Sequence, residues 1–486
     1  MRGIRPVGHA VLATAICVAL SQAVGHAAPN VLFIAVDDLN TCVEGMHGET
    51  TIPTPNIARL ARRGVLFNNA HCAAPACNPS RTSVLTGLAP TTSGVYYNWQ
   101  DWRKNRRLIE HPTLPEWFRR AGYRTLGGGK IYHAATLSRE GYTGYLDPQP
   151  WDEYFPSKQR QMPQEVLPPR IPMNTDKAFY GGRFDWAPLP IEPDEMADAK
   201  VVRWAAEQLA RRHDKPLFLA VGIYRPHIPW YTPETYFRKH PLDEIELPET
   251  VPDDLADVPE AGRKMAKRDW HRWIVEHGKW KAAVQGYYAS VSFADDMVGR
   301  LIDALDASPI RDDTIVVLWA DHGYHLGQKE HWEKFALWEQ TTRVPLIVVA
   351  PGVSVKGGVC EAPVSLLDIY PTLIELCGLP PVSSLDGESL VPWLREPDRV
   401  SKRAVVTTQG RGNHAVRSAR WRYIRYADGS EELYDQLSDP KDFQNLADKP
   451  EFAEVKRALA VRFPDHEADL DPSVRAKPRK AAPAAQ

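Results

Sequence analysis

The sequence carries almost no net charge, and this absence excludes some classes of function. Its 486 residues include 59 lysines and arginines against 61 aspartates and glutamates, a formal net charge of −2. Because nucleic-acid-binding proteins usually carry a strongly basic surface, no nucleic-acid partner is expected. An anionic substrate would have to meet positive charge that is placed locally.

Long apolar runs and internal repeats are missing as well. No stretch after residue 28 resembles a transmembrane helix, so no membrane partner is expected. The apolar fraction of 43% and the charged fraction of 25% are ordinary for a globular protein and exclude a wholly disordered or collagen-like chain. The length fits two domains, or one large α/β domain with an appendage.

The N-terminal residues have the pattern of a secretion signal. Arg2 and Arg5 precede an apolar run from Ala10 to Leu20, and small residues follow up to Ala28. We therefore expect residues 1–28 to be a signal peptide and the protein to be secreted or periplasmic. The alternative is a single anchor helix, for which the apolar run is short.

Cysteines are few, and their number is informative in an exported protein. Five remain after the signal: Cys42, Cys72, Cys77, Cys360 and Cys377. An odd number means that at least one does not pair within the chain. If that one is Cys77, the other four could form up to two disulfide bridges, and the sequence leaves their pairing open.

Buried strands and helices alternate along the chain. Apolar runs typical of strands buried on both faces of a parallel sheet occur at Asn30–Val36, Tyr123–Leu126, Leu217–Ile223, Thr314–Ala320 and Arg343–Ala350. Helical patterns occur at Thr54–Arg63, Thr113–Ala121, Asp194–Arg212, Gln285–Ala307 and Ser365–Gly378. This alternation predicts an α/β fold with a mostly parallel core.

Polar side chains follow four of these strands. They are Asp37 and Asp38, Lys130 and His133, His227, and Asp321 and His322. Any one of them alone would usually be a turn or capping residue. Because an open α/β sheet gathers the carboxyl ends of its strands at one edge, where ligands bind, the four sets together predict a functional site there.

The chain changes character after about residue 397. Short alternating segments at Ala404–Thr408, Ala415–Val416, Trp421–Tyr426 and Glu432–Tyr434, with a hairpin turn at Ala427–Ser430, predict a small antiparallel sheet. Glu451–Phe463 is a candidate closing helix. The last residues are rich in Ala, Pro and Lys without apolar periodicity, so residues 471–486 are expected to be a disordered tail.

The stretch around Cys77 carries the most chemical information. Cys77 precedes a short helix that begins near Pro79, and a helix N-terminus favours an anion through its free N–H groups and its dipole. Arg81 lies about one turn further along and can point at the same place. On spacing alone, a buried or disulfide-bonded loop cysteine explains this stretch equally well.

The residues Cys77-Asn78-Pro79-Ser80-Arg81, followed by Thr82-Ser83 and Leu85-Thr86-Gly87, closely resemble the Cys-X-Pro-Ser-Arg motif of type I sulfatases. The resemblance extends from Asp37 to about Asp435. The segments Gly129–His133, Arg225–Pro229 and Asp321–Tyr324 are most similar to the branch of iduronate-2-sulfatase and its bacterial relatives. The resemblance to type I sulfatases implies an alkaline-phosphatase-like α/β sandwich, with a large mixed, mostly parallel sheet and a smaller C-terminal antiparallel sheet. The implied domains are a catalytic domain at residues 29–397 and an α+β subdomain at residues 398–470.

The resemblance also implies a cofactor and a modification. A maturation enzyme would oxidise Cys77 to formylglycine, whose hydrated aldehyde is the nucleophile. The implied metal ligands are Asp37, Asp38, Cys77, Asp321 and His322. Such carboxylates suit a hard cation, so Ca²⁺ is expected and Mg²⁺ is the alternative. His322 departs from the Asn that many sulfatases carry there, and it is either a weak ligand or a neighbour.

The remaining catalytic roles are carried over by motif. Asp321 is the base for the attacking hydroxyl, and His227 with Lys334 matches the acid that protonates the leaving alcohol. His133 matches the base for sulfate release, while Arg81 and Lys130 would hold the nucleophile and balance its charge. Without the resemblance, Lys130 is a solvated loop lysine and His227 packs an ordered loop. Lys334 then belongs to a charged run at residues 328–334, of which His325, Lys329 and His331 are expected to be its solvated neighbours.

The resemblance leads to a secreted sulfatase, a sulfuric ester hydrolase, that acts on a sulfated carbohydrate. Two alternatives remain: a phosphonate or phosphate-ester hydrolase of the same superfamily, and a catalytically silent carbohydrate-binding relative. Retention of the whole residue set argues against the silent relative. An aromatic and basic loop from Tyr96 to Arg107 could also contact an anionic sugar through Arg103, Lys104, Arg106 and Arg107, or it could be a solvated basic loop.

Overall fold

The computed structural model describes residues 28–46, 52–136, 142–144, 146–164, 174 and 184–474. Apart from residue 28, the expected signal peptide lies outside these residues, and so do residues 475–486 of the expected tail. Within the described residues, no helix is both long and apolar enough to cross a membrane.

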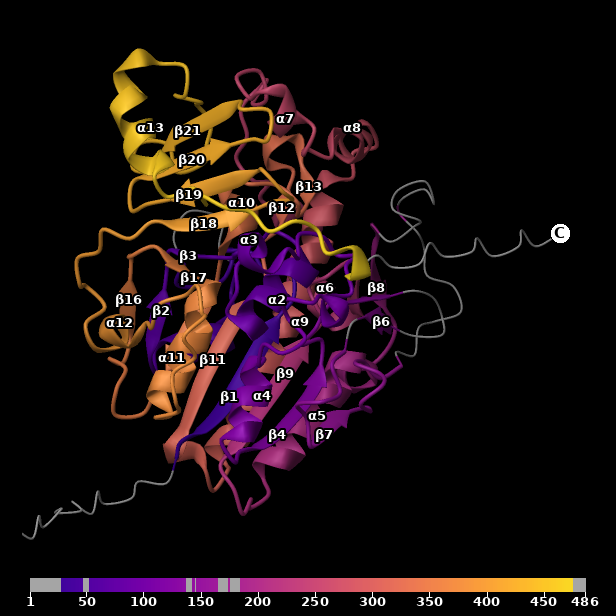
Figure 1. Cartoon of the computed structure of the whole chain (residues 1–486). Coiled ribbons are helices and arrows are strands. Elements are labelled where there is room, and N and C mark those ends of the chain that lie inside the picture. The colour runs from indigo at the N-terminus through magenta and orange to yellow at the C-terminus, as the bar shows by residue number, and fades with distance from the viewer. Residues whose placement is uncertain are drawn as a thin grey trace, which may run out of the picture.

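A mixed, mostly parallel sheet of eight strands forms the centre of the molecule (Figure 1). In spatial order the strands are β16 (Gly358–Cys360), β2 (Val65–Phe67), β15 (Leu346–Val349), β11 (Thr314–Ala320), β1 (Asn30–Val36), β9 (Leu217–Ile223), β4 (Arg124–Gly129) and β7 (Glu153–Phe155). Only β15 runs antiparallel to its neighbours. The central strands β1, β9 and β11 are almost wholly buried, as their apolar runs predict.

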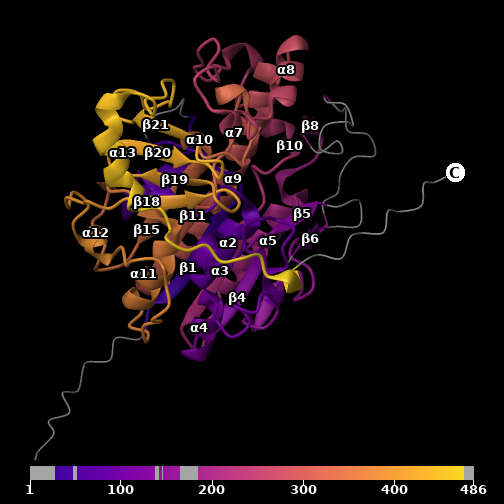
Figure 2. The same cartoon turned by 45° about the horizontal axis from the view of Figure 1, so that its top comes forward.

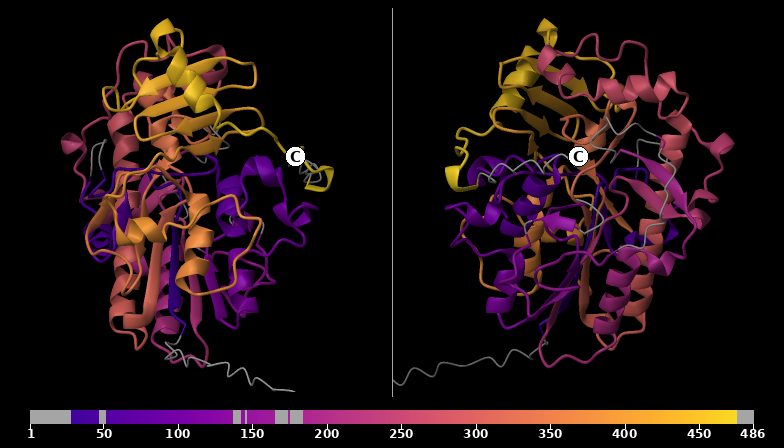
Figure 3. Two further views of the ribbon diagram at one scale, coloured as in Figure 1. Left: turned by 60° about the vertical axis from the view of Figure 1, so that its left-hand side comes forward. Right: turned by 90° about the vertical axis from the view of Figure 1, so that its right-hand side faces the viewer.

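Helices cover both faces of this sheet (Figure 3). On one face α2 (Cys77–Thr86) contacts α4 (Leu114–Arg120) and α11 (Ile369–Leu376). On the other face the long helix α9 (Trp280–Asp306) packs against α1 (Pro55–Ala61) and α5 (Ala197–Leu209). The prediction of an α/β sandwich is therefore confirmed.

A smaller antiparallel sheet lies over the carboxyl ends of the central strands (Figure 1). Its strands are β18 (Val405–Thr408), β19 (His414–Arg417), β20 (Trp421–Arg425) and β21 (Glu431–Asp435), and α13 (Ala453–Ala460) packs on it. This sheet was also predicted.

After α13 the chain returns to the main domain as an extended segment, residues 464–474, which we call the return segment. Figure 2 shows it crossing in front of α3 (Pro90–Ser93). Ala468 N–H donates to the Thr91 carbonyl at 2.7 Å, and Tyr96 Oη donates to the Ala468 carbonyl at 2.8 Å. The first residues of the expected disordered tail, Asp471–Val474, belong to this segment and end in a short 3₁₀ helix at Pro472–Val474.

Shorter elements complete the fold. The strands are β3 (Ala70–His71), β14 (Arg343–Val344) and β17 (Val364–Ser365) in one sheet, and the pairs β12 (His325–Leu326) with β13 (Trp332–Glu333), β8 (Trp186–Leu189) with β10 (Trp230–Pro233), and β5 (Ala134–Thr136) with β6 (Tyr142–Gly144). The helices are α6 (Glu234–Phe237), α7 (Glu260–Arg263), α8 (Arg268–Glu276), α10 (Glu339–Thr342) and α12 (Val391–Arg395).

One strand differs from the sequence prediction, and the structure also describes cysteines whose pairing the sequence left open. The expected strand Arg343–Ala350 is interrupted at Pro345, because proline cannot donate to a strand ladder, so β14 pairs with β3 while only β15 joins the main sheet. Of the four cysteines whose pairing the sequence leaves open, Cys72, Cys360 and Cys377 are buried free thiols.

Candidate active site

The register of four adjacent strands brings the predicted polar residues to one level. On β1, Val36 is paired with Ala320 of β11 and Ile223 of β9, so Asp37 follows directly beside Asp321. On β4, Gly129 is paired with Gly222 of β9, so Lys130 emerges at the same edge. Residues almost 300 positions apart in the chain therefore meet, as the backbone N–H of Asp38 shows by donating to Asp321 Oδ1 at 3.1 Å.

Two glycines allow β4 and β9 to approach closely at this edge. Gly129 has a φ of 75°, and a Cβ there would lie 2.0 Å from the Gly222 carbonyl oxygen. A Cβ on Gly222 would lie 2.2 Å from the backbone of Lys130. Larger residues at these positions would push Lys130 away from the site.

Cys77 is the first residue of α2, and its side chain is completely buried. Its Sγ lies 3.2 Å from His322 Nε2. Ser80, one turn further along, donates from Oγ to the Asp321 carbonyl at 2.5 Å and ties the helix to the end of β11. The helix N-terminus therefore directs its positive dipole end towards the carboxylates.

The metal-ligand residues expected from the resemblance come together. Ligand atoms of Asp37, Cys77, Asp321 and His322 lie within 4.8 Å of one another, and so do ligand atoms of Asp37, Asp38, Cys77 and His227. All of these side chains are at least nine-tenths buried. Buried carboxylates at such distances require positive charge between them.

Three cations supply part of that charge. Arg81 donates from Nε to Asp321 Oδ2 at 2.8 Å and from Nη2 to Asp37 Oδ1 at 2.9 Å. Lys130 Nζ donates to Asp37 Oδ2. Lys334 Nζ donates to both oxygens of Asp38, at 2.8 and 3.1 Å. Each carboxylate is thereby paired with at least one cation, so neither Lys130 nor Lys334 is a solvated loop residue.

Burial and these charges shift the pKa values of the site. Burial alone would raise the pKa of Asp37, but Lys130 and Arg81 outweigh it and hold the pKa well below its usual range. At Asp38 burial dominates over Lys334 and raises the pKa to about 7. Burial opposes a charge on His322, yet Asp321 and its other acidic neighbours raise its pKa to about 9.

The donor set fits a divalent cation. His322 Nε2 lies 3.5 Å from Asp38 Oδ1 and 3.5 Å from Asp321 Oδ2, at the point where these carboxylates and Cys77 face one another. With protein groups alone, a protonated His322 supplies the positive charge at this point. A hard cation bound to the carboxylates would replace that proton, because metal ligands must give up their protons.

Two further histidines border the cluster. His227 donates from Nδ1 to the Ile228 carbonyl at 2.6 Å, which leaves Nε2 for chemistry. Burial, together with Lys130 and Lys334, holds the pKa of His227 well below its usual range. The half-buried His133 follows Lys130 at the end of β4, and burial with the nearby Lys130 lowers its pKa to about 3.

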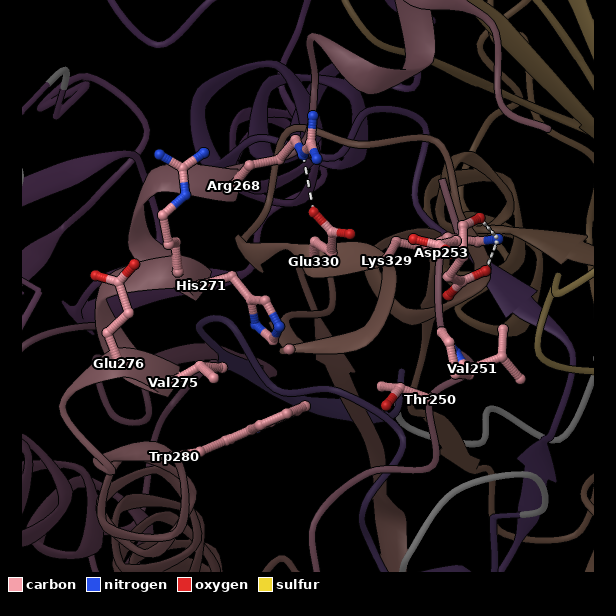
Figure 4. Close-up of a pocket in the computed structure, with 14 residues that line it drawn as sticks. Thr250, Val251, Asp253, Arg268, His271, Val275, Glu276, Trp280, Lys329 and Glu330 are labelled. Carbon is pink, nitrogen blue, oxygen red and sulfur yellow. Dashed lines mark hydrogen bonds and ion pairs between the residues drawn. The ribbon is translucent and has the colours of Figure 1, made fainter. Parts of the chain in front are cut away.

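Lys334 is delivered by a loop, residues 327–335, whose outer face is anchored by ion pairs (Figure 4). Lys329 Nζ lies 2.6 Å from Asp254 Oδ1, and Arg268 Nε lies 2.8 Å from Glu330 Oε2. The expectation that His325, Lys329 and His331 are solvated was wrong. They are 0%, 1% and 0% exposed, because residues of the loop 250–254, of α8 and of the C-terminal sheet enclose this segment.

The cations of the loop from Tyr96 to Arg107 bind protein acceptors. Arg103 and Lys104 both pair with Asp101, at 2.9 and 3.1 Å. Arg106 pairs with Asp471 of the return segment at 3.2 Å, and Arg107 donates to the Asp469 carbonyl at 3.1 Å. These contacts tie the loop to Asp101 and to the return segment.

The same loop supports the start of α2. Asn78, next to Cys77, donates from its backbone N–H to Asn98 Oδ1 at 2.9 Å and from its side chain to the Tyr97 carbonyl at 3.1 Å. Tyr97 and Trp99 stack with ring centroids 5.6 Å apart, and Trp99 is 44% exposed. An aromatic surface therefore remains beside the nucleophile helix.

Sequence reasoning missed two residues of the site. Tyr287 of α9 holds the loop after β1, since its hydroxyl donates to the Asp38 carbonyl at 2.8 Å and accepts from Asn40 N–H at 2.9 Å. Glu333, directly before Lys334, is buried without a hydrogen-bond partner for either carboxyl oxygen within the described residues. No local sequence signal distinguishes either residue from a core tyrosine or a surface glutamate.

Cys77 lies at a helix start, surrounded by buried carboxylates and cations at the carboxyl edge of an α/β sheet, an arrangement that suits the hydrolysis of an anionic ester. Residues 29–379 match the Sulfatase family, and residues 327–469 match the C-terminal region of N-sulphoglucosamine sulphohydrolase. The chain belongs to the sulfatase family and is a sulfuric ester hydrolase.

Individual relatives agree with this assignment. A protein described as a sulfatase from Formosa agariphila is 39% identical over 462 residues, which cover 91% of this chain and 88% of the relative. Iduronate 2-sulfatase from Mus musculus is 30% identical over 426 residues, covering 77% and 74% of the two chains. A solved structure in complex with its substrate D-glucosamine-2-N,6-O-disulfate shares the fold, with a TM-score of 0.68, 20% identity, and coverage of 89% of this chain and 96% of that chain.

Proposed function

We propose that this sulfatase removes sulfate from a sulfated saccharide, with Cys77 converted to formylglycine and a divalent cation, Ca²⁺ or Mg²⁺, at Asp37, Asp38 and Asp321. The observation that carries the proposal is the buried cluster in which Cys77 Sγ and the ligand atoms of Asp37, Asp321 and His322 lie within 4.8 Å. His322 would complete the donor set in its neutral form.

The charge of the site supports an anionic substrate. Arg81, Lys130 and Lys334 balance the charges of Asp37, Asp38 and Asp321. The two positive charges of a bound cation would then remain to meet the sulfate ester and the ionised nucleophile. Such a cation polarises the sulfuryl group and lowers the pKa of the attacking hydroxyl.

The chain's own residues divide the remaining tasks. Arg81 and Lys130 fix the position of Asp37 beside the nucleophile, and Asp321 accepts the proton of the attacking hydroxyl. An alkyl alcohol is a poor leaving group and needs a proton as it departs. Lys334 Nζ carries a proton that it can give to the alcohol. His227 can give one only after taking up a proton on Nε2 in the substrate complex, because its pKa is held well below its usual range and its Nδ1–H donates to the Ile228 carbonyl. His133 serves as the base when sulfate is released.

The nature of the saccharide is proposed from the relatives. One of them is named iduronate 2-sulfatase, which supports a sulfated uronide as substrate for this chain. The exposed Trp99, stacked on the partly buried Tyr97, offers an aromatic face on which a sugar ring can stack. A phosphonate or phosphate ester is the competing substrate class.

Substrate assays with the purified enzyme test this proposal. Defined sulfated disaccharides, sulfated uronides among them, would be compared with 4-nitrophenyl sulfate, phosphate monoesters and phosphonate monoesters. We expect the highest kcat/KM for a sulfated uronide. Faster turnover of phosphate or phosphonate esters than of any sulfate ester would overturn the sulfatase assignment, and faster turnover of uncharged sulfated hexoses would overturn the uronide.

Peptide mass spectrometry tests the modification of Cys77 and the removal of the signal peptide. We propose that residues 1–28 direct export and that a maturation enzyme modifies Cys77. Active protein should therefore lack the first 28 residues and carry an aldehyde in place of the thiol at Cys77. Full activity with an unmodified thiol would contradict the nucleophile, and an inactive but folded Cys77→Ala variant is the matched control.

A further inference from the structure

Glu333 is held in a backbone conformation that its side chain disfavours. Its φ is 95°, in the left-handed region that glycine adopts freely and other residues rarely do. Lys329, Glu330 and Phe335 of the same loop also have positive φ values. Because the ion pairs of Lys329 and Glu330 anchor the loop from outside (Figure 4), its path is imposed on Glu333. A glycine at position 333 would follow this path with less strain.

The fold offers the buried carboxyl group of Glu333 no hydrogen-bond donor in the described part of the chain. The residue is 1% exposed, and within the described part of the chain neither of its oxygens accepts a hydrogen bond. The neighbouring carboxylates differ, since Asp37 is paired with Arg81 and Asp38 with Lys334. A buried acceptor without a donor is destabilising, so its retention needs a reason outside the resting structure.

The position of Glu333 suggests that reason. It directly precedes Lys334, whose Nζ contacts Asp38 at 2.8 Å. Burial raises the pKa of Glu333 to about 7, and the charges of Lys334, of Lys267 beside α8, and of Asp38 and His322 also act on it. Glu333 therefore borders the active site through Lys334 without belonging to its ligand cluster. Backbone strain combined with an unmet acceptor beside an active site is typical of a functional residue.

We propose that Glu333 determines substrate specificity by accepting a hydrogen bond from a hydroxyl group next to the sulfate ester of the saccharide. This proposal rests on the proposed function. The sulfate group offers only acceptor oxygens and repels an ionised carboxylate, so the partner of Glu333 must be a donor. A sugar ring carries hydroxyl groups beside the sulfated carbon, whereas a simple aryl sulfate carries none.

Two variants of Glu333 and two classes of substrate test the proposal. Glu333→Gly removes the carboxyl group and relieves the backbone, so its melting temperature should be unchanged or higher. Its kcat/KM for a sulfated saccharide with a free neighbouring hydroxyl should fall about 10- to 100-fold, with 4-nitrophenyl sulfate changed by less than about 3-fold. Glu333→Gln keeps an acceptor oxygen and should recover most of the loss.

A deoxy analogue and a control variant sharpen the test. If the hydrogen bond exists, the unaltered enzyme should hydrolyse the deoxy saccharide, which lacks the neighbouring hydroxyl, more slowly. The Glu333→Gly variant should hydrolyse it no more slowly than that, because the variant and the deoxy substrate each remove the same contact. Glu330→Gly is the matched control, since Glu330 also has a positive φ, of 48°, but pairs outward with Arg268. This control should affect both substrate classes equally.

The outcomes separate this proposal from the proposed function. Equal losses on saccharide and aryl sulfate in Glu333→Gly, or additive losses with the deoxy analogue, would overturn the role of Glu333 while leaving the sulfatase intact. Loss in both Glu333→Gly and Glu333→Gln, together with faster turnover of choline sulfate than of saccharides by the unaltered enzyme, would replace the hydroxyl by a cationic partner. An unaltered enzyme that hydrolyses no sulfated saccharide would overturn both proposals.

Discussion

Replacing Arg81 by alanine should destabilise the whole protein, because this side chain joins two buried carboxylates. Its Nε and Nη2 contact Asp321 and Asp37 at 2.8 and 2.9 Å, and its Nη1 donates to the carbonyl groups of Lys130 and Ile131. The arginine side chain is 1% exposed and both carboxylates are 0% exposed. Water therefore cannot replace the lost partner without opening the site.

The magnitude follows from these contacts. Removing one partner of a buried ion pair costs about 3–5 kcal/mol, since it leaves an uncompensated charge in the interior. The unfolding entropy of a 486-residue chain is about 1 kcal/mol/K, at about 2.1 cal/mol/K per residue. Arg81→Ala should therefore lower the free energy of unfolding by about 3–5 kcal/mol and the melting temperature by about 3–5 °C.

Differential scanning calorimetry on chelated protein measures this effect. Arg120→Ala is a suitable control, because Arg120 pairs with Glu116 on the exposed face of α4, where an ion pair contributes about 0.5 kcal/mol or less. Arg81→Lys should give an intermediate loss, since a single ammonium cannot bond both carboxylates with the geometry of a guanidinium. A normally folded Arg81→Ala protein that melts within about 1 °C of the parent would refute the reasoning.

Two further predictions concern proton transfer and pH. His227→Ala should lower kcat/KM for a sulfated saccharide by about 10²–10⁴-fold but for 4-nitrophenyl sulfate far less, because nitrophenolate leaves without a proton; equal losses would assign His227 a positioning role. The pKa of His322 is raised from its ordinary 6.5 to about 9, so its stabilisation of chelated protein is complete below pH 6.5 and is lost as the pH rises towards 9. The melting temperature of chelated protein should therefore fall between pH 6.5 and 9, and that of Ca²⁺-loaded protein should fall less. Equal falls of the two melting temperatures would contradict the replacement of the His322 proton by the metal.

The strand ends of the site could be predicted because their signal is local. Six consecutive apolar residues followed by Asp37, or by Asp321, mark a buried parallel strand and its carboxyl end. The sheet then brings these ends together whatever the intervening loops do. The helix after this motif could be predicted for the same reason, although it begins at Cys77 itself, two residues before the predicted start near Pro79.

The loop that carries Lys334 could not be predicted in this way. The partners that bury it lie far away in the sequence: His331 accepts from the backbone N–H of Lys267, 64 residues earlier, and Lys329 pairs with Asp254, 75 residues earlier. A charged run such as residues 328–334 is usually solvated, and no residue within it predicts contacts with these distant partners. The strain at Glu333 is equally invisible, because a φ of 95° is imposed by tertiary contacts and not by the residue.

The complete burial of Cys77 limits the time at which its proposed conversion to formylglycine can take place. The His322 ring that lies 3.2 Å from its sulfur is encoded 245 residues later in the chain. At about 5–20 residues per second, synthesis of that interval takes roughly 10–50 s. During this time the thiol stands in a chain that cannot yet close over it, and afterwards no enzyme reaches it without unfolding the site. The oxidation that we propose for Cys77 would therefore have to precede the folding of the second half of the protein, and a chain that folded first would enclose an unmodified cysteine.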